Sequence, residues 1–450
     1  MRCSRSIAVV SASLFAFLFS AGLLAQESEL AALSSWIAID APTGHEHLAI
    51  EQIHSEYAGW DRDSYGNLAK VVGRGEPRRL VACALDSYSY AVSQITEVGY
   101  LRLHRIGSGS NHPLWDQAHE GQQLRILTRS GPVVGVTAVA NGHFAAQHRS
   151  ETAIISHNDL WLDVGAESAL EVADMGIALL DPVLRHLPAW SYTNEVAGPR
   201  TGARAGCAAT LAAAEAGING SEGSTKYLIS VQQVFGWIGL AAGVSSDANA
   251  DEIIVLGVGS TDFDNRIVDG LGTRADVVLT GNDKAAIRLI TPAVTDADAL
   301  MERMSLASAN QVLEALVEAI NPDAQRPAWL AVAEQAAVLN NEASRWGRHD
   351  NIDRLQEIEA LLDQVAEKSA VPGHEGPIRN AIYNAMPQWA KETAQTDEMG
   401  NMWVEVGPAG QATVFLAHMD EVGYQVESID RNGVVNLSRL GGVVETAWEG

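Results

Sequence analysis

Residues 66–107 read GNLAKVVGRGEPRRLVACALDSYSYAVSQITEVGYLRLHRIG, and residues 400–441 read GNMWVEVGPAGQATVFLAHMDEVGYQVESIDRNGVVNLSRLG. The two stretches align without a gap at an offset of 334 residues, and 12 of the 42 aligned positions are identical. Upstream of them, Gly44-His45-Glu46 recurs as Gly373-His374-Glu375, each time after a helical stretch and a proline. Chance similarity does not extend over so long a gapless run, so we predict that the chain contains one domain twice.

The offset sets the size of the repeated domain at a little over 300 residues. We therefore assign residues 28–335 to a first copy, residues 336–350 to a polar helical linker and residues 351–450 to a second copy. The second copy comprises only the N-terminal part of the domain. We expect the sequence to be truncated or partial.

Helical and strand patterns alternate along the chain. In the second copy, residues 355–368 and 377–386 have helical periodicity, and residues 413–418 form an apolar run typical of a buried strand. This alternation predicts a three-layer α/β/α domain, followed by the N-terminal part of a second such domain. In the first copy, residues 124–141 contain short β-rich runs broken by Gly and Pro, which indicates an inserted β-barrel-like subdomain at about residues 105–187.

The first 25 residues have the pattern of a secretory signal peptide. Arg2 and Arg5 precede an uncharged run over residues 7–24, which Ala25 and the first acidic residues follow. The alternative is a retained membrane anchor, because 18 uncharged residues are just long enough to span a bilayer. Three serines and a glycine dilute the run and favour cleavage. We expect a periplasmic or secreted protein with no integral membrane segment after cleavage.

The composition excludes several classes of protein. A hydrophobic share of 47% and a charged share of 19% are those of a globular protein. The net charge of −26 repels phosphate, so nucleic acid is not an expected partner. Three cysteines are too few for a disulfide scaffold, and Cys3 leaves with the signal peptide. Cys83 and Cys207 could pair in an oxidising compartment, but we predict two buried free thiols.

The chemistry is concentrated at Ala417-His418-Met419-Asp420-Glu421-Val422-Gly423. On a strand, residues two apart point to the same face, so His418 and Asp420 would lie together. A neutral imidazole is a good ligand for a divalent metal, and a neighbouring carboxylate can accept its other N–H and fix its tautomer. The pattern therefore makes His418 a candidate metal ligand, although most single His-x-Asp pairs are ordinary polar residues on the surface.

Four motifs of the second copy together resemble one enzyme family. They are Pro-Gly-His-Glu at 372–375, Asp-Glu-Met-Gly-Asn at 397–401, Leu-Ala-His-Met-Asp-Glu-Val-Gly-Tyr at 416–424 and Arg-Leu-Gly-Gly at 439–442. Their order and spacing resemble the dinuclear metallo-aminopeptidases that include glutamyl, deblocking and large tetrahedral aminopeptidases. The resemblance covers residues 352–450 and, more faintly, residues 30–335.

The resemblance implies a zinc-peptidase-like fold and a hydrolase that acts on peptide substrates with two divalent metal ions, zinc or cobalt. His418 would then be a metal ligand, and Asp420 the catalytic carboxylate that orients it. The resemblance also allows a homo-oligomer. The family's remaining ligands and its general base would lie beyond Gly450.

The first copy retains the family's landmarks without their chemistry. Ala84 aligns with His418 and Ser87 with Glu421, and only Asp86 is kept. The other ligand and base positions correspond, by the same resemblance, to Gly202, Gln233, Val234 and Gly257. Glycine, alanine and valine offer no side-chain ligand, and glutamine cannot take a proton as glutamate does. The resemblance therefore implies a first copy that keeps the fold and has lost the metals.

Two functions follow from this organisation. In the first, the protein is an exported metal-dependent aminopeptidase, with activity in a complete second copy and a degenerate first copy beside it. In the alternative, neither copy is active, and the protein is a binding or assembly module built on a peptidase fold. We favour the enzyme, because an intact His-x-Asp-Glu is seldom retained without metals.

Overall fold

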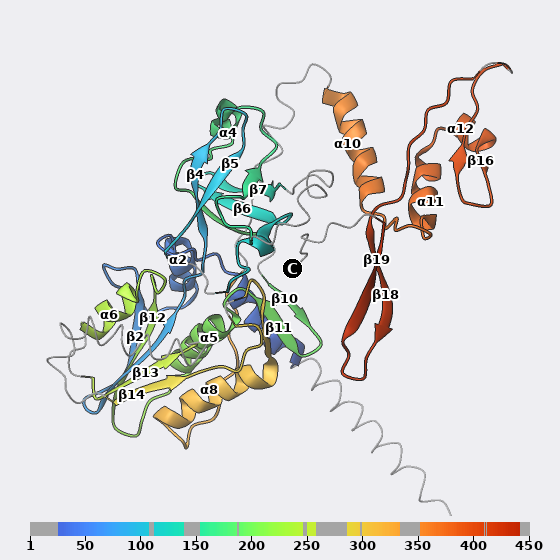
Figure 1. Ribbon diagram of the computed structural model, residues 1–450. Coiled ribbons are helices and arrows are strands. Elements are labelled where there is room, and N and C mark those ends of the chain that lie inside the picture. Colours follow the sequence, from blue (N-terminus) through green and yellow to red (C-terminus); the bar gives the residue numbers. More distant parts are fainter. Residues whose placement is uncertain are drawn as a thin grey trace, which may run out of the picture. The chain divides into compact units, whose positions relative to one another are not determined.

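The computed structural model describes residues 26–107, 112–138, 154–186, 189–245, 250–257, 286–297, 299–333, 352–408, 410 and 412–441. The expected signal segment and linker lie outside these ranges. The described residues form two compact units, the first up to residue 333 and the second from residue 352 (Figure 1). Within the described ranges, no helix is both long and apolar enough to cross a membrane.

A six-stranded mixed sheet forms the centre of the first unit. Its strand order is β1-β2-β12-β3-β13-β14. Strands β12, β3, β13 and β14 run parallel, whereas β1 and β2 pair antiparallel at one edge. The strand bounds are Asp61–Arg62 (β1), Leu68–Arg74 (β2), Gly223–Ser230 (β12), Arg78–Ala84 (β3), Glu252–Leu256 (β13) and Ala286–Ile290 (β14).

Helices cover both faces of this sheet. Alternate residues of β3 divide between two cores: Val81 and Cys83 join the core built with one set of helices, and Leu80 and Ala82 join the core on the opposite face. The first set is the helix at residues 26–38 with α2 (His47–Glu56), α5 (Thr201–Glu215) and α8 (Leu306–Ile320). The opposite face packs on α6 (Ile238–Ser245). This arrangement confirms the three-layer α/β/α prediction.

The inserted β subdomain is a closed six-stranded barrel in the order β4-β5-β8-β7-β6-β9. It already includes β4 and β5, so it begins before residue 105. A separate core fills it, with Val92, Leu124 and Leu162 fully buried. The strands are Tyr90–Ile95 (β4), Leu101–Arg105 (β5), Gln123–Thr128 (β6), Gly131–Thr137 (β7), Trp161–Asp163 (β8) and Pro182–Arg185 (β9).

The described part of the first unit also contains three further short strands and two short helices. The strands β10 (Trp190–Tyr192), β11 (Glu195–Gly198) and β15 (Glu302–Ser305) form an antiparallel sheet in that order. A 3-10 helix, η1 (Gln117–His119), and α4 (Ala169–Asp174) belong to the barrel region.

The described part of the second unit contains three helices and two hairpins. The helices are α10 (Ile352–Ala366), α11 (Gly376–Ala385) and α12 (Gln388–Thr393). The hairpins pair β16 (Gln395–Thr396) with β17 (Met402–Trp403), and β18 (Gly423–Ile429) with β19 (Val435–Leu440). The predicted helices at 355–368 and 377–386 are confirmed as α10 and α11, with small shifts at their ends.

The strand predicted at residues 413–418 is wrong for this structure. Residues 412–422 form neither a helix nor a paired strand, and Phe415 and Leu416 are 95% and 94% exposed. The aligned strand of the first unit, β3, lies between β12 and β13, which come more than a hundred residues later in the chain. An apolar run becomes a buried strand only where neighbouring strands accept its backbone hydrogen bonds, and the described part of the second unit supplies none for this segment.

Candidate functional site

The structure brings together the two residues that the sequence singles out in the second unit. His418 Nδ1 lies 2.9 Å from the backbone oxygen of Asp420 and 3.2 Å from its Oδ1. Both acceptors are oxygens, so Nδ1 carries the proton and Nε2 is the ring nitrogen with the lone pair. The two side chains are 85% and 46% exposed.

Neighbouring backbone contacts position this segment. The Glu421 N–H donates to the Ala370 carbonyl over 2.9 Å, and the Ala370 N–H donates to Glu421 Oε1 over 3.1 Å. Gly423 packs so closely on Val371 that an added Cβ would lie 2.3 Å from Val371 Cγ1. Residues 421–423 are therefore held on the loop that follows α10. These contacts fix the backbone directly after His418 and Asp420.

The residues present do not fit a two-metal centre. Among the described residues, no three His, Cys, Asp or Glu side chains lie close enough together to hold one metal ion. A catalytic zinc is bound by about three protein ligands and a water. His418 is therefore a single oriented imidazole here, and no catalytic step through a metal can be assigned to this chain.

In the first unit, the position aligned with His418 is Ala84, the last residue of β3, and it is buried. The retained carboxylate, Asp86, is fully buried. Its Oδ1 accepts from the Gln233 N–H over 3.0 Å, and its Oδ2 accepts from the Val234 N–H over 3.0 Å and from Thr43 Oγ1 over 2.8 Å. Asp86 therefore anchors the loop after β12. It has no imidazole to orient, because residue 84 is alanine.

The glycines at two other family positions have no room for a metal-binding side chain. An added Cβ at Gly202 would lie 2.9 Å from Pro292 Cγ and 3.1 Å from Val294 Cγ1. At Gly257, φ is +78°, and an added Cβ would lie 2.6 Å from the Cα of Ala203. Neighbouring atoms thus occupy the space that ligands would need at both positions.

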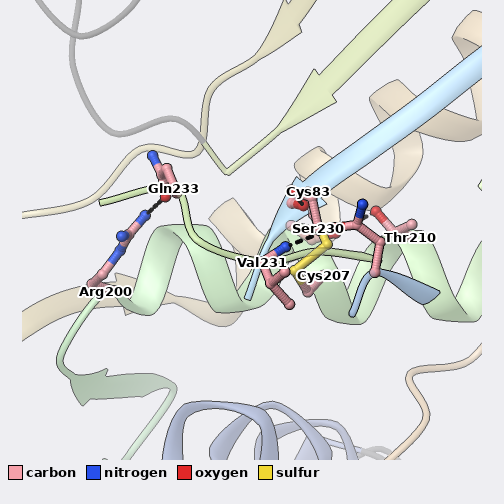
Figure 2. The surroundings of a disulfide bond; sticks show 9 residues. Cys83, Arg200, Cys207, Thr210, Ser230, Val231 and Gln233 are labelled. Atoms are coloured by element: carbon pink, nitrogen blue, oxygen red, sulfur yellow. Dashed lines mark hydrogen bonds between the residues drawn. A yellow bond between two sulfur atoms is a disulfide. The ribbon is translucent and has the colours of Figure 1, made fainter. Parts of the chain in front are cut away.

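A guanidinium group binds the residue at the expected base position. Arg200, directly before α5, donates from Nη2 to Gln233 Oε1, as Figure 2 shows. The Arg200 side chain also lies over the Tyr88 ring, with Cζ 5.0 Å from the ring centroid. A neutral amide that accepts from arginine cannot act as a general base. At Ala84, Gly202, Val234 and Gly257 the first unit therefore has no side-chain metal ligand, and at Gln233 it has no carboxylate base.

The two cysteines of the first unit form a disulfide, which corrects the prediction of free thiols. Cys83 in β3 and Cys207 in α5 are fully buried, and their Cα atoms lie 5.1 Å apart (Figure 2). Their pairing depends on the packing of α5 across β3, which a separation of 124 residues does not reveal. The disulfide joins the end of the strand that carries Ala84 to the helix that carries Gly202.

Glu46, the last residue of the recurring Gly44-His45-Glu46, is a buried acid. It precedes α2, but its side chain makes no capping hydrogen bond. Instead, its Oε1 accepts from the Gln232 N–H over 2.8 Å. Burial, and secondarily the negative charge of Asp86, raise the pKa of Glu46 to about 7.

Comparison with known proteins finds similarity to a family and to relatives that are all described as aminopeptidases. A family model described as M42 glutamyl aminopeptidase matches residues 66–278 and 400–450, so it matches more than half of the chain. SgcX, a provisional aminopeptidase of Escherichia coli (strain K12), is 28% identical over 193 residues, which are 41% of this chain and 50% of SgcX. The lysyl aminopeptidase of Pyrococcus furiosus is 28% identical over 148 residues, which are 31% of this chain and 41% of that enzyme. The matched part thus spans half or less of either relative.

Solved structures share the fold at low sequence identity. Aminopeptidase APDkam598 of the archaeon Desulfurococcus kamchatkensis superposes with a TM-score of 0.55 at 16% identity, over 67% of this chain and 96% of that chain. The TET aminopeptidase of Thaumarchaeota archaeon SCGC AB-539-E09 gives 0.52 at 18% identity, over 65% and 96%. A structure titled as the dodecamer of PhTET1-12s gives 0.50 at 18% identity, over 64% and 98%. These likenesses confirm the predicted zinc-peptidase-like fold.

Proposed function

Because the chain belongs to the M42 glutamyl aminopeptidase family, we propose that it is part of an exported, metal-dependent aminopeptidase in which the second copy performs the chemistry. The first copy is then a non-catalytic partner domain. The observation that carries this proposal is the contrast between His418 and Ala84. Asp420 holds Nδ1 of His418, whereas the aligned residue of the first unit is a buried alanine next to the Cys83–Cys207 disulfide.

The hairpins after the two sites support the duplication on which the proposal depends. Strands β4 and β5 pair Tyr90 with Arg105, and β18 and β19 pair Tyr424 with Arg439. The bulges also correspond, because the register shifts after Val92 in one hairpin and after Val426 in the other. Every residue pair of the first hairpin recurs in the second at the offset of 334 residues. Identical register, including a bulge, is typical of related copies.

Activity requires ligands that the described residues do not supply. At an offset of 334, the counterparts of Gly202, Gln233, Val234 and Gly257 would be numbered beyond 450. In the complete site, His418 would supply one imidazole ligand, and Asp420 would keep that imidazole in one tautomer. Divalent metal, zinc or cobalt, would supply Lewis acidity and an activated water when bound. Peptides with free N-termini are the proposed substrates.

Two features support an extracytoplasmic location and assembly. The buried disulfide of the first unit is of the kind found in proteins of oxidising compartments, which agrees with the signal-like N-terminus. A homo-oligomer is also part of the proposal, because a structural neighbour is titled as a dodecamer. N-terminal sequencing of the mature protein tests export; an intact Met1 would contradict it.

The function is tested by activity and metal content together. The 450-residue chain, assayed on a panel of aminoacyl anilides with added zinc, cobalt or manganese, should show no metal-dependent turnover. The natural protein with a complete second copy should be active and chelator-sensitive. There, His418→Ala should abolish activity and lower the metal content, whereas Asp420→Asn should reduce activity with less metal loss, because it only misorients the ligand. Loss of a side chain that orients a metal ligand typically lowers metal affinity or activity about 10- to 100-fold.

Two control variants make the result specific. His54→Ala, in α2, removes an exposed imidazole of the first unit and should change nothing. Ala84→His should not restore metal binding there, because Gly202 and Gly257 remain without ligands. Full activity and metal content in the His418→Ala protein would refute the site. An inactive, metal-free natural protein with a complete second copy would favour the alternative, a binding or assembly module.

A further inference from the structure

Two buried carboxylates hold the loop that follows β12 in the first unit. Glu46 Oε1 accepts from the Gln232 N–H over 2.8 Å. Asp86 accepts from the next two N–H groups, those of Gln233 and Val234, over 3.0 Å each. The backbone at Gln232 lies in the left-handed region, with φ of +58°, which is uncommon for a residue other than glycine. Hydrogen bonds from three successive N–H groups to two carboxylates therefore fix a loop conformation that its sequence does not favour.

This loop carries the positions at which the family has its general base and one metal ligand. By the resemblance, these positions are 233 and 234, which hold glutamine and valine in the first unit. The direction in which both side chains point depends on the backbone that Glu46 and Asp86 hold. The second copy retains the two carboxylates, since Glu375 aligns with Glu46 and Asp420 aligns with Asp86.

The turn that carries Glu375 has the same backbone geometry as the turn that carries Glu46. Gly44 and Gly373 have φ of +83° and +84°, and the histidine after each donates its N–H to the carbonyl three residues earlier. The φ and ψ angles are −71° and −5° at Glu46, and −75° and 3° at Glu375. The helices α2 and α11 each begin at the next residue and have ten residues. Local geometry therefore gives the two glutamates equivalent positions.

The turn is also joined to the aspartate segment in the same way in both units. In each, the residue after the aspartate donates its N–H to the carbonyl of the alanine three residues before the turn glycine. The pairs are Ser87 with Ala41, over 2.8 Å, and Glu421 with Ala370, over 2.9 Å. The glutamate and the aspartate are therefore held at matching positions in the two units.

In the second unit, the Glu375 carboxylate lies on its own turn and near Asp420. Its Oε1 accepts from the Gly373 N–H over 2.7 Å, which lowers the pKa of Glu375, and the charge of Asp420 acts in the opposite direction. A carboxylate has two oxygens with about four acceptor sites. The Glu375 carboxylate can therefore accept a further N–H from a loop placed as the one after β12 is placed in the first unit.

Asp420 can hold such a loop and orient His418 at the same time. In the first unit, the Thr43 hydroxyl donates to Asp86 Oδ2 over 2.8 Å, beside the two N–H groups of the loop. The residue that corresponds to Thr43 is Pro372, which has neither a hydroxyl nor an N–H. One acceptor site of Asp420 is therefore left for the imidazole of His418, whose Nδ1 lies 3.2 Å from Asp420 Oδ1.

We propose that Glu375 is a positioning residue of the site in the second copy. In the complete copy, its carboxylate accepts from the N–H of the residue that corresponds to Gln232, and so fixes the loop that carries the general base. This inference rests on the proposed function, because the residues of that loop would be numbered beyond 450 at the offset of 334. Glu375 acts through the loop and not on the substrate, so its loss should lower kcat and leave KM unchanged.

Kinetics of the natural protein with a complete second copy test the effect on turnover. Glu375→Ala should lower kcat about 10- to 100-fold, because the loop loses a hydrogen bond to a charged group and the base is misplaced. KM should change by less than about twofold. Glu375→Gln keeps an acceptor oxygen and should lose less than the alanine variant. Glu357→Ala, which removes an exposed carboxylate of α10, is the matched control and should change nothing.

Hydrogen exchange tests the contact without any dependence on activity. In the 450-residue chain, Glu46→Ala should make exchange of the Gln232 amide about tenfold faster, whereas Glu46→Gln should leave it largely protected. In the natural protein, Glu375→Ala should accelerate exchange in the corresponding loop, and Glu357→Ala should not. Thermal melting first establishes that each variant is folded. If Glu46→Ala unfolds the first unit, exchange in the Glu375→Ala protein decides the matter.

The outcomes separate this inference from the proposed function. An active natural protein in which Glu375→Ala keeps its kcat and the slow exchange of the loop would overturn the positioning role and leave the proposed function intact. A raised KM with unchanged kcat would also overturn it, because that result indicates a contact with the substrate. An inactive natural protein would contradict the proposed function instead. Exchange of the loop in the Glu375→Ala protein would still show whether Glu375 holds it.

Discussion

The Cys83–Cys207 disulfide should supply a large part of the stability of the first unit. It closes a loop defined by a sequence separation of 124 residues. In the chain-entropy description, a crosslink over a loop of this length removes about 16 cal/mol/K from the unfolded ensemble, or about 5 kcal/mol at 25 °C. A whole domain is stable by only about 5–15 kcal/mol, so the first unit should be marginal without this bond.

Denaturant unfolding with and without reductant measures this contribution. The oxidised protein should lose about 5 kcal/mol of unfolding free energy on reduction. A protein with both Cys83→Ala and Cys207→Ala should start at the lower value and show no response to reductant, which makes it the matched control. Because both sulfur atoms are buried, the double variant also loses some packing and should be slightly less stable than the reduced protein.

Two results would contradict the predicted stabilisation by the disulfide. If reductant leaves the unfolding transition of the oxidised protein unchanged, the crosslink does not constrain the unfolded chain. If thiol titration of the protein purified from an oxidising compartment gives two free thiols, the disulfide itself is absent. In that case, the original expectation of two buried free cysteines would stand, and the support for export from this bond would be lost.

The remaining predictions concern buried positions around the degenerate site. Glu46 has a folded pKa of about 7 against 4.5 for the free group, so its native state binds more protons than the unfolded state. The stability that this acid provides is complete below pH 4.5 and is lost as the pH rises through 7, by up to about 3 kcal/mol, and Glu46→Gln should flatten this dependence in unfolding experiments at several pH values. Gly202→Asp, which would add a metal-ligand type, should destabilise the first unit by about 1–3 kcal/mol because its side chain overlaps Pro292 and Val294, and it should bind no zinc in metal analysis. A stable Gly202→Asp protein that binds zinc would contradict the view of a filled site.

The fold class could be predicted because it depends on local patterns. Apolar runs such as residues 253–256 alternate with helical periodicity, and β13 and α8 form where these patterns occur. The family could be recognised for a similar reason, since its motifs are short and keep their order. The prediction at residues 413–418 failed because a buried strand also requires neighbouring strands, and its apolar pattern cannot say whether those neighbours are present.

Two features of the candidate site residues could also be predicted, because they depend on local spacing or on residue type. The spacing of His418 and Asp420 is a local property, and the structure places the two side chains within hydrogen-bonding distance as a two-residue separation suggests. The absence of chemistry at Ala84 is likewise visible in the sequence, because alanine has no group that could bind a metal. Residue identity alone therefore decided which copy can contribute a ligand.

Only the tertiary structure decided what surrounds the positions of the first unit that align with the family's site. The Cys83–Cys207 bond, the contact of Arg200 with Gln233 and the buried Glu46 each join segments that are far apart in the chain. Their pairing depends on how α5 and the loop after β12 pack on β3. By itself, the sequence determined the layers of the fold and the family, because these follow from residue types and their spacing. Burial and charge balance arise from long-range packing, which no local pattern encodes.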